Sequence, residues 1–146
     1  MKKVEERDII RILPLFQNEA DNYLATNKRI IEKADIFAWF KTPDQIPYVA
    51  YEGDAPTAYG EIWVDDEEGD LELAHLITSQ EFRGQGYGKK LVEELLEEAK
   101  TFPYDDIFIR VLPENARAIK LYKSFGFEEI KPFDARYVWM KRKNLR

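Results

Sequence analysis

The segment Arg83-Gly84-Gln85-Gly86-Tyr87-Gly88-Lys89-Lys90 decides the fold class, because it joins a run of β-formers to an amphipathic helix. Its glycines permit a tight turn with free backbone N–H groups, and the N-terminus of the following helix favours an anion. The spacing fits neither common phosphate motif: a Walker loop needs four residues between its two glycines, and the dinucleotide fingerprint needs glycine at position 89. The segment therefore predicts a strand, a turn suited to a phosphate and a helix. A turn that binds nothing is the alternative.

The segments on both sides of this turn alternate between helical and extended patterns. The first third, from about Glu6 to Lys41, has apolar residues at helical spacing and predicts two helices, the second ending before Pro43. Short runs of β-formers then predict an antiparallel meander of three strands, at Tyr48–Glu52, Thr57–Val64 and Leu71–Ser79. The expected later elements are helices over Gly86–Lys100 and Asn115–Phe125 and strands over Ile107–Leu112, Phe127–Lys131 and Tyr137–Lys141. This order predicts a mixed α/β fold.

Length, charge and composition exclude several classes of protein. A length of 146 residues fits one domain spanning residues 1–146. The 22 Lys and Arg residues against 28 Asp and Glu give a net charge of −6, which disfavours nucleic acid and membrane as partners. The absence of cysteine excludes disulfides and thiolate nucleophiles, and with one histidine no metal site is expected. No stretch approaches the ~20 apolar residues of a membrane span, and the charged N-terminus does not resemble a signal peptide, so a cytoplasmic location is expected.

A second motif runs from Leu112 to Phe127. Asn115 is positioned to cap the N-terminus of a helix, and Gly126 is positioned to end it. Tyr122 shares a helical face with apolar residues, so by itself it is most simply a core tyrosine.

Taken together, the two motifs resemble those of the Gcn5-related N-acetyltransferase (GNAT) superfamily. The resemblance rests on Arg83-x-x-Gly86-x-Gly88 at the start of a helix, followed after one strand by Asn115, Ala118, Leu121-Tyr122 and Phe125-Gly126-Phe127. It implies a central, mostly antiparallel sheet flanked by helices, in which the fourth and fifth strands splay apart. It also implies acetyl-coenzyme A as the cofactor, bound in the cleft between those strands.

The resemblance assigns roles to individual positions. The pantetheine arm would follow the backbone of Leu76, Ile77 and Thr78, Asn115 would contact that arm, and Tyr122 would reach the thioester sulfur as the acid. The pyrophosphate would bind the N–H groups of Arg83, Gly84, Gln85, Gly86, Tyr87, Gly88 and Lys89. The absence of cysteine excludes an acetyl-cysteine intermediate, and direct attack of the amine on the thioester in a ternary complex is expected.

The general base is less clearly marked. At pH 7 an amine with a pKa of about 10.4 is neutral in roughly one molecule in 2,500, so exposing the nucleophile costs about 4.6 kcal/mol and needs a base or a water chain. Glu72 stands where the histone-acetylating branch carries its glutamate and is the first choice. Another branch has a glutamate where this chain has Arg110. His75 lies on the opposite strand face from Glu72 unless a bulge intervenes, and Glu61 or a water relay are further alternatives.

The sequence thus predicts an acetyl-CoA-dependent N-acetyltransferase that acts on a primary amine of a small molecule or peptide. The alternative is a non-catalytic acetyl-CoA-binding sensor or interaction module. The acceptor is not identified, because the family forms that site from its variable parts, the first two helices and the last hairpin. The last strand is expected to offer a free edge at which members of the superfamily often pair, so a homodimer is consistent with the sequence.

Overall fold

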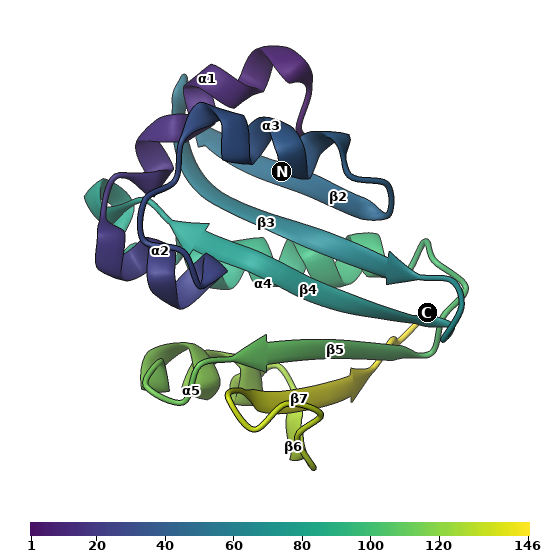
Figure 1. Ribbon diagram of the computed structural model, residues 1–146. Helices are drawn as coiled ribbons and strands as arrows, with labels where there is room; N and C mark the ends of the chain where they lie inside the picture. Colours follow the sequence, from purple (N-terminus) through teal and green to yellow (C-terminus); the bar gives the residue numbers. More distant parts are fainter.

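The computed structural model describes residues 1–146, which form one twisted sheet of seven strands covered by helices on both faces (Figure 1). The spatial order of the strands is β1-β2-β3-β4-β5-β7-β6. In chain order they are β1 (Lys2–Lys3), β2 (Gln45–Glu52), β3 (Ala55–Asp65), β4 (Asp70–Thr78), β5 (Asp106–Val111), β6 (Glu128–Ile130) and β7 (Val138–Lys143). The α-helices are α1 (Ile9–Ile12), α2 (Glu19–Thr26), α3 (Lys33–Lys41), α4 (Tyr87–Ala99) and α5 (Ala116–Ser124).

The predicted meander is confirmed, since β2, β3 and β4 pair antiparallel in sequence order. Strands β4 and β5 then run parallel, but they pair only over Leu71–Leu73 and Ile107–Ile109. Beyond these residues the two strands diverge, as Figure 1 shows. The splay of the fourth and fifth strands, expected from the resemblance, is therefore present, and the C-terminal half of β4 has an open edge.

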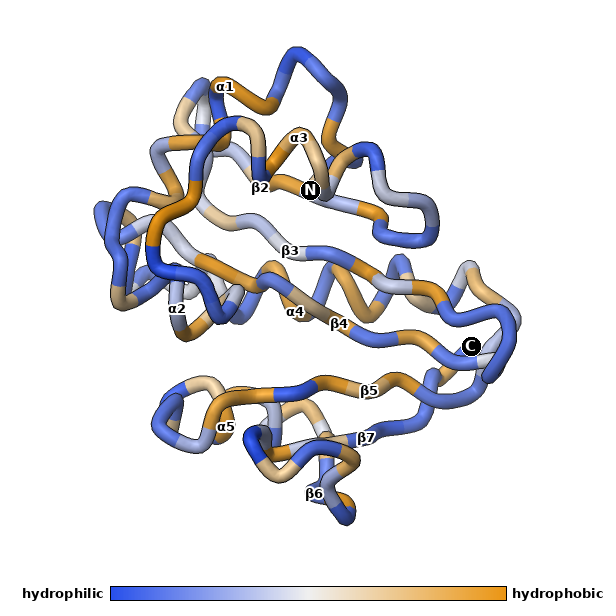
Figure 2. The backbone as a smooth tube through the Cα atoms, in the orientation of Figure 1, coloured by the Kyte–Doolittle hydropathy of each residue, from blue (hydrophilic) through white to orange (hydrophobic).

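Two apolar clusters cover the two faces of the sheet. The larger cluster packs the apolar face of α4 and residues of α5 against β3, β4, β5 and β7. The smaller cluster joins α1, the 3₁₀ turn after it and α3 to β2, β3 and the end of β4. Figure 2 shows hydrophobic positions recurring along β4 and β5, whereas the turn from β3 to β4 is hydrophilic. Helix α4 approaches β3 so closely that a Cβ at Gly60 would lie 3.0 Å from Leu95 Cδ1.

The N-terminal third is more broken than the sequence predicts. In place of the first long helix, the chain forms α1 between two 3₁₀ turns, Glu6–Asp8 and Leu13–Phe16, and then α2 as a separate helix. The last helix of this region, α3, ends at Lys41, before Pro43 as predicted. The buried Asp8 carboxylate connects the start of this region to β2, because it accepts hydrogen bonds from the Glu5 N–H (2.8 Å) and the Tyr51 hydroxyl (2.9 Å) and pairs with Lys2 (3.1 Å).

The prediction that the last strand forms a free edge of the sheet is wrong. Strand β7 lies between β5 and β6, so the edges of the sheet are β1 and the three-residue strand β6. The reason is that β6 folds back on the outer side of β7, a choice of side that chain order does not reveal. No helix is long and apolar enough to cross a membrane.

Candidate functional site

A cavity of about 580 Å³ lies between the open half of β4, the glycine-rich turn, α2, α4 and α5. It is lined by most of the residues that the sequence singled out: Leu76, Ile77, Thr78, Arg83, Gly84, Gly86, Tyr87, Gly88, Lys89, Asn115 and Tyr122. Among the predicted site residues, Gln85 and Glu72 do not line it. The two sequence motifs therefore meet on opposite walls of one cavity.

The turn before α4 presents a row of free backbone N–H groups. Gly84 and Gly86 adopt φ values of +82° and +83°, which glycine tolerates and L-residues rarely adopt. The N–H groups of Gly84, Gln85 and Gly86 donate no hydrogen bond within the chain, and those of the first turn of α4 have no intrahelical acceptor. Gln85 therefore contributes a free N–H although its side chain does not line the cavity. Free N–H groups at the positive end of a 13-residue helix suit an anion.

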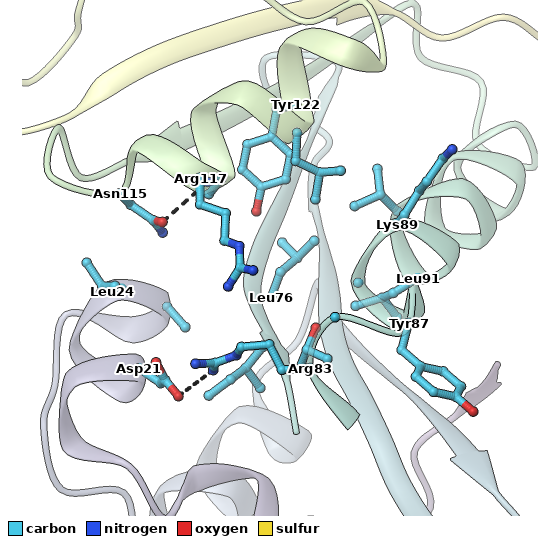
Figure 3. A pocket seen from close by; sticks show the side chains of 18 of the residues that line it. Asp21, Leu24, Leu76, Arg83, Tyr87, Lys89, Leu91, Asn115, Arg117 and Tyr122 are labelled. Carbon is cyan, nitrogen blue, oxygen red and sulfur yellow. Dashed lines mark hydrogen bonds and ion pairs between the residues drawn. The ribbon is translucent and has the colours of Figure 1, made fainter. Parts of the chain in front are cut away.

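Three basic side chains line the same cavity, but they are not equally available. The Arg83 guanidinium pairs with the Asp21 carboxylate of α2 at 2.6 Å, so much of its charge is already balanced. Lys89 and Arg117 take part in no ion pair within 4.0 Å. Figure 3 shows the Arg117 side chain reaching from α5 into the space above Arg83. The positive charge available to an anion therefore comes from Lys89 and Arg117 more than from Arg83.

The open edge of β4 forms the floor of the cavity. Ile77 and Thr78 pair with β3 on one side, Leu76 lies in the irregular stretch just before them, and none of the three pairs with β5, because the ladder to β5 ends at Leu73. Gly88 packs against this floor so tightly that a Cβ at that position would lie 3.0 Å from Thr78 Oγ1. The edge therefore offers backbone donors and acceptors to an extended ligand, in the way that a sheet accepts an added strand.

Tyr122 projects from α5 into the cavity, where Figure 3 shows its hydroxyl directed toward Leu76. Its ring is 7% exposed and packs edge-on against Phe127, with 6.2 Å between centroids. Burial raises the pKa of Tyr122 well above its ordinary value, and no charge or hydrogen bond contributes to that rise. The side chain is therefore a neutral hydroxyl at the wall of the cavity, with its proton free to be donated.

Asn115 has the capping role that the sequence predicts. Its Oδ1 accepts the Ala118 N–H at the start of α5 (3.4 Å), which leaves its side-chain amide N–H groups for a ligand in the cavity. Gly126, at φ +86°, ends the helix as predicted, and the Phe127 N–H bonds back to the Tyr122 carbonyl (3.2 Å). The two ends of α5 are thus fixed, and Tyr122 is held on its inward face.

A second, smaller cavity of about 100 Å³ lies where β4 and β5 separate. It shares Leu24 and Ala25 of α2 with the first cavity. The other lining residues come from α2 and its end, β3, β4, β5 and the last hairpin: Thr26, Asn27, Trp63, Glu72, Leu73, Ala74, His75, Arg110, Leu112 and Tyr137. The two cavities therefore meet at α2.

The second cavity contains Glu72, the base suggested by the sequence, but its carboxylate is already engaged. Arg110 donates from Nε to one carboxylate oxygen (2.7 Å) and from a terminal nitrogen to the other (2.8 Å). The hydrogen bond to Glu72 raises the pKa of Arg110, whose guanidinium also lies 4.6 Å from the Trp139 ring centroid. A bidentate pair of this kind is among the strongest that a carboxylate forms.

A bulge brings His75 into the same cavity. The pairing of β3 with β4 shifts between Tyr59 and Glu61, and His75 adopts a left-handed conformation with φ +54°. This extra residue cancels the strict alternation of β4, so His75 and Glu72 line one cavity although they are three residues apart. The opposite-face arrangement, which the sequence analysis expected in the absence of a bulge, is not adopted.

Asp21 and Arg117 are two charged residues of the first cavity that sequence reasoning missed. Arg117 lies four residues before Leu121, and both line the first cavity, so the i, i+4 spacing within the second motif could have identified it. Asp21 gave no comparable signal, because its contact with Arg83 joins residues 62 positions apart.

Comparisons with known proteins agree with this geometry. The family model described as the acetyltransferase (GNAT) family matches residues 12–127. An uncharacterized N-acetyltransferase of Dictyostelium discoideum is 44% identical over 62 residues, which are 42% of this chain and 29% of that protein. A spermine/spermidine N(1)-acetyltransferase of Bacillus subtilis is 28% identical over 130 residues, 85% of this chain and 82% of that protein. The chain thus spans about a third of the length of the first curated relatives that it matches.

Solved structures share the whole architecture. The crystal structure of spermidine N-acetyltransferase from Vibrio cholerae, in complex with CoA and spermine, superposes with a TM-score of 0.81 at 17% identity and covers 98% of this chain and 94% of that one. At this level of identity the likeness establishes the shared fold.

Proposed function

The chain belongs to the acetyltransferase (GNAT) family, and on this premise we propose that it transfers an acetyl group from acetyl-coenzyme A to a primary amine of a small molecule or peptide. Family membership confirms the resemblance drawn from the sequence. The observation that supports the proposal most is the pair of adjoining cavities: one ends at a row of free N–H groups, and the other lies where β4 and β5 separate. Two ligands held there are neighbours, as direct transfer requires.

The residues of the larger cavity fit the shape and charge of acetyl-coenzyme A. The free N–H groups from Gly84 to Lys89 would hold the pyrophosphate, with Lys89 and Arg117 adding positive charge. Gly86 lines this space, and no heavy atom lies within 4 Å of its Cβ position. Arg83 would act mainly through its ion pair, which ties the turn to α2.

The open edge of β4 fits the pantetheine arm. That arm contains amide groups, and the unpaired edge of Leu76, Ile77 and Thr78 offers them complementary backbone partners. The free amide of Asn115 lies on the facing wall. An arm held in this way would lead from the anion-binding turn towards Tyr122.

Bound acetyl-coenzyme A supplies an acetyl group activated as a thioester. Tyr122 would donate its hydroxyl proton to the leaving sulfur, because the hydroxyl is neutral, faces the cavity and has no partner within the chain. The chain has no cysteine to accept the acetyl group, which supports direct attack by the amine.

The smaller cavity would receive the acceptor amine. Its walls are the aromatic rings of Trp63 and Tyr137, the imidazole of His75 and the Glu72–Arg110 pair. Aromatic rings and a paired carboxylate are compatible with an ammonium group on arrival. Relatives named for acetylating spermine and spermidine are consistent with such an acceptor, and peptide N-termini share the same amine chemistry.

A thiol-release assay tests the proposal. The purified chain is incubated with acetyl-coenzyme A and a panel of polyamines, amino acids, aminoglycosides and peptides, while free thiol and product mass are recorded. We expect a mass increase of one acetyl group on at least one amine, in step with thiol release. Tight cofactor binding without turnover on any amine would instead favour the sensor or interaction module.

A further inference from the structure

The strained residue of β4 is the one histidine of the chain. His75 combines a left-handed backbone with a position on the bulge between β3 and β4. A non-glycine residue is strained in this conformation, and such strain persists only where the surroundings fix it. Two tryptophans hold the ring: Trp39 lies 4.5 Å away between centroids, and Trp63 meets it edge-on at 5.2 Å.

The imidazole is anchored by a fully buried carboxylate. Glu61 has no exposed surface, and its Oε2 lies 2.9 Å from His75 Nδ1. The same carboxylate accepts hydrogen bonds from the Tyr59 hydroxyl (2.6 Å) and from Trp63 Nε1 (2.7 Å). Three partners around a buried carboxylate stabilise it as an anion, since each hydrogen bond replaces one to water.

These contacts select one tautomer of the histidine. An ionised carboxylate only accepts hydrogen bonds, so His75 Nδ1 must carry the hydrogen that faces Glu61. The other nitrogen, Nε2, then bears a lone pair. Because His75 lines the second cavity while Nδ1 is committed to Glu61, Nε2 is the nitrogen available to a ligand there.

The neighbouring carboxylate is less suited to accept a proton. Both oxygens of Glu72 are occupied by Arg110, and taking a proton from an amine would require that pair to break. His75 needs no such rearrangement, because its free nitrogen has no partner within the chain.

We propose that His75 is the general base of the reaction and that Glu61 is its positioning residue. This inference rests on the proposed acetyl transfer. The acceptor ammonium gives one N–H proton to His75 Nε2, and its nitrogen uses the freed electron pair to attack the thioester carbonyl, while the imidazolium keeps its Nδ1–H bond to Glu61. As the carbon–sulfur bond then breaks, Tyr122 gives its proton to the leaving sulfur. The new amide nitrogen loses its second proton, which restores the Tyr122 hydroxyl through solvent. The proton leaves His75 for solvent when the product departs. Glu61 stays ionised throughout and stabilises the imidazolium.

The proposal predicts a dependence on pH with a definite sign. A protonated imidazole cannot accept a proton, so kcat/KM falls on the acid side as His75 becomes charged. The other charged or titratable groups that share the second cavity or the Glu61 carboxylate with His75 are Glu61 and Tyr59 on β3, Glu72 on β4, Arg110 on β5 and Tyr137 before β7. The acid limb must therefore be assigned by substitution.

Kinetics of three variants make that assignment. His75→Asn keeps a residue type that tolerates a left-handed backbone, and we expect kcat to fall by roughly 10²- to 10⁴-fold with loss of the acid limb. Glu61→Gln keeps the shape of the side chain but presents an amide N–H that can donate to Nδ1, which favours the wrong tautomer of His75. We therefore expect kcat to fall at least about tenfold, as it does for wrong-tautomer changes in catalytic triads. Glu72→Gln should retain the acid limb. An acid limb that survives in His75→Asn would overturn the proposal, and its disappearance in Glu72→Gln would identify Glu72 as the base instead.

A spectroscopic measurement separates this inference from the proposed function. With one histidine in the chain, imidazole ¹⁵N signals are unambiguous. We expect the neutral wild type to carry its hydrogen on Nδ1, and Glu61→Gln to move it to Nε2, with thermal unfolding and acetyl-coenzyme A binding showing that the variant is folded. If no amine is turned over, the proposed function fails and the base role fails with it. If the neutral His75 of the wild type carries its hydrogen on Nε2, the proposed roles of His75 and Glu61 are overturned even if the chain acetylates an amine.

Discussion

Replacing Tyr122 by phenylalanine isolates one oxygen atom at the meeting point of the two motifs. The ring would keep its edge-on contact with Phe127, because the hydroxyl takes no part in it. The hydroxyl also makes no hydrogen bond that the substitution would break. We therefore expect the free energy of unfolding to change by less than about 1 kcal/mol.

The expected loss of rate follows from the environment of the hydroxyl. General acids contribute roughly 10²- to 10⁴-fold. Burial raises the pKa of Tyr122, which weakens it as an acid, although the same surroundings also make a leaving thiolate more basic. The effect should therefore fall near the lower end, about 10²-fold in kcat, or about 2.7 kcal/mol in activation free energy.

Single-turnover measurements of thiol release test this prediction, because they isolate the chemical step from product release. The dissociation constant of acetyl-coenzyme A, measured by calorimetry, should stay within about twofold of wild type. Because the raised pKa keeps the hydroxyl protonated, no alkaline loss of activity from Tyr122 is expected below about pH 10. A Tyr122→Phe variant with a single-turnover rate within threefold of wild type would refute the acid role.

Three further substitutions probe stability and binding. Burial opposes the ionisation of Asp8, but its hydrogen bonds and its lysine partner outweigh that effect and lower its pKa, so its contribution is present above about pH 4 and is lost as pH falls further. Asp8→Asn should lower the free energy of unfolding by about 1.5–3 kcal/mol at pH 7 and by less at pH 3. Urea titrations at the two pH values would check this, and an equal decrease in the free energy of unfolding at both would contradict it. Gly60→Ala places a Cβ 3.0 Å from Leu95 Cδ1 and should lower the free energy of unfolding by about 1–3 kcal/mol in the same assay. An unchanged urea midpoint would contradict this and show that α4 shifts to accommodate the methyl group. Arg117→Gln should weaken acetyl-coenzyme A binding about two- to fivefold and reduce its salt dependence, whereas Lys120→Gln, on the same helix but outside the cavity, should not; equal effects would argue against a contact.

The elements predicted best were those with strong local patterns. Helix α4 follows from its apolar face and the glycines before it, and α5 follows from Asn115 and Gly126 at its ends. The first cavity was predictable for the same reason, since both motifs are short and local. The helices of the first third were less predictable, because the chain breaks between Leu13 and Asn18 through packing against the sheet.

The second cavity depends on contacts that local patterns do not contain. The bulge at His75 arises from the register of β4 against β3, and a strictly alternating strand would have turned the ring away from Glu61. The pair between Glu72 and Arg110 depends on the parallel register of β4 and β5. Both determine which groups can accept a proton. The sequence could therefore name Glu72, His75 and Glu61 as alternatives but could not rank them.

Calorimetric titration of acetyl-coenzyme A into three proteins tests whether the turn before α4 binds the cofactor. Gly86→Glu places bulk and negative charge among the free N–H groups, and Gly126→Glu places the same side chain at a similar φ, +86° against +83°, at the far end of α5. We expect micromolar binding by wild type and Gly126→Glu and none by Gly86→Glu. Equal binding by all three, or no binding by the folded wild type, would contradict this expectation.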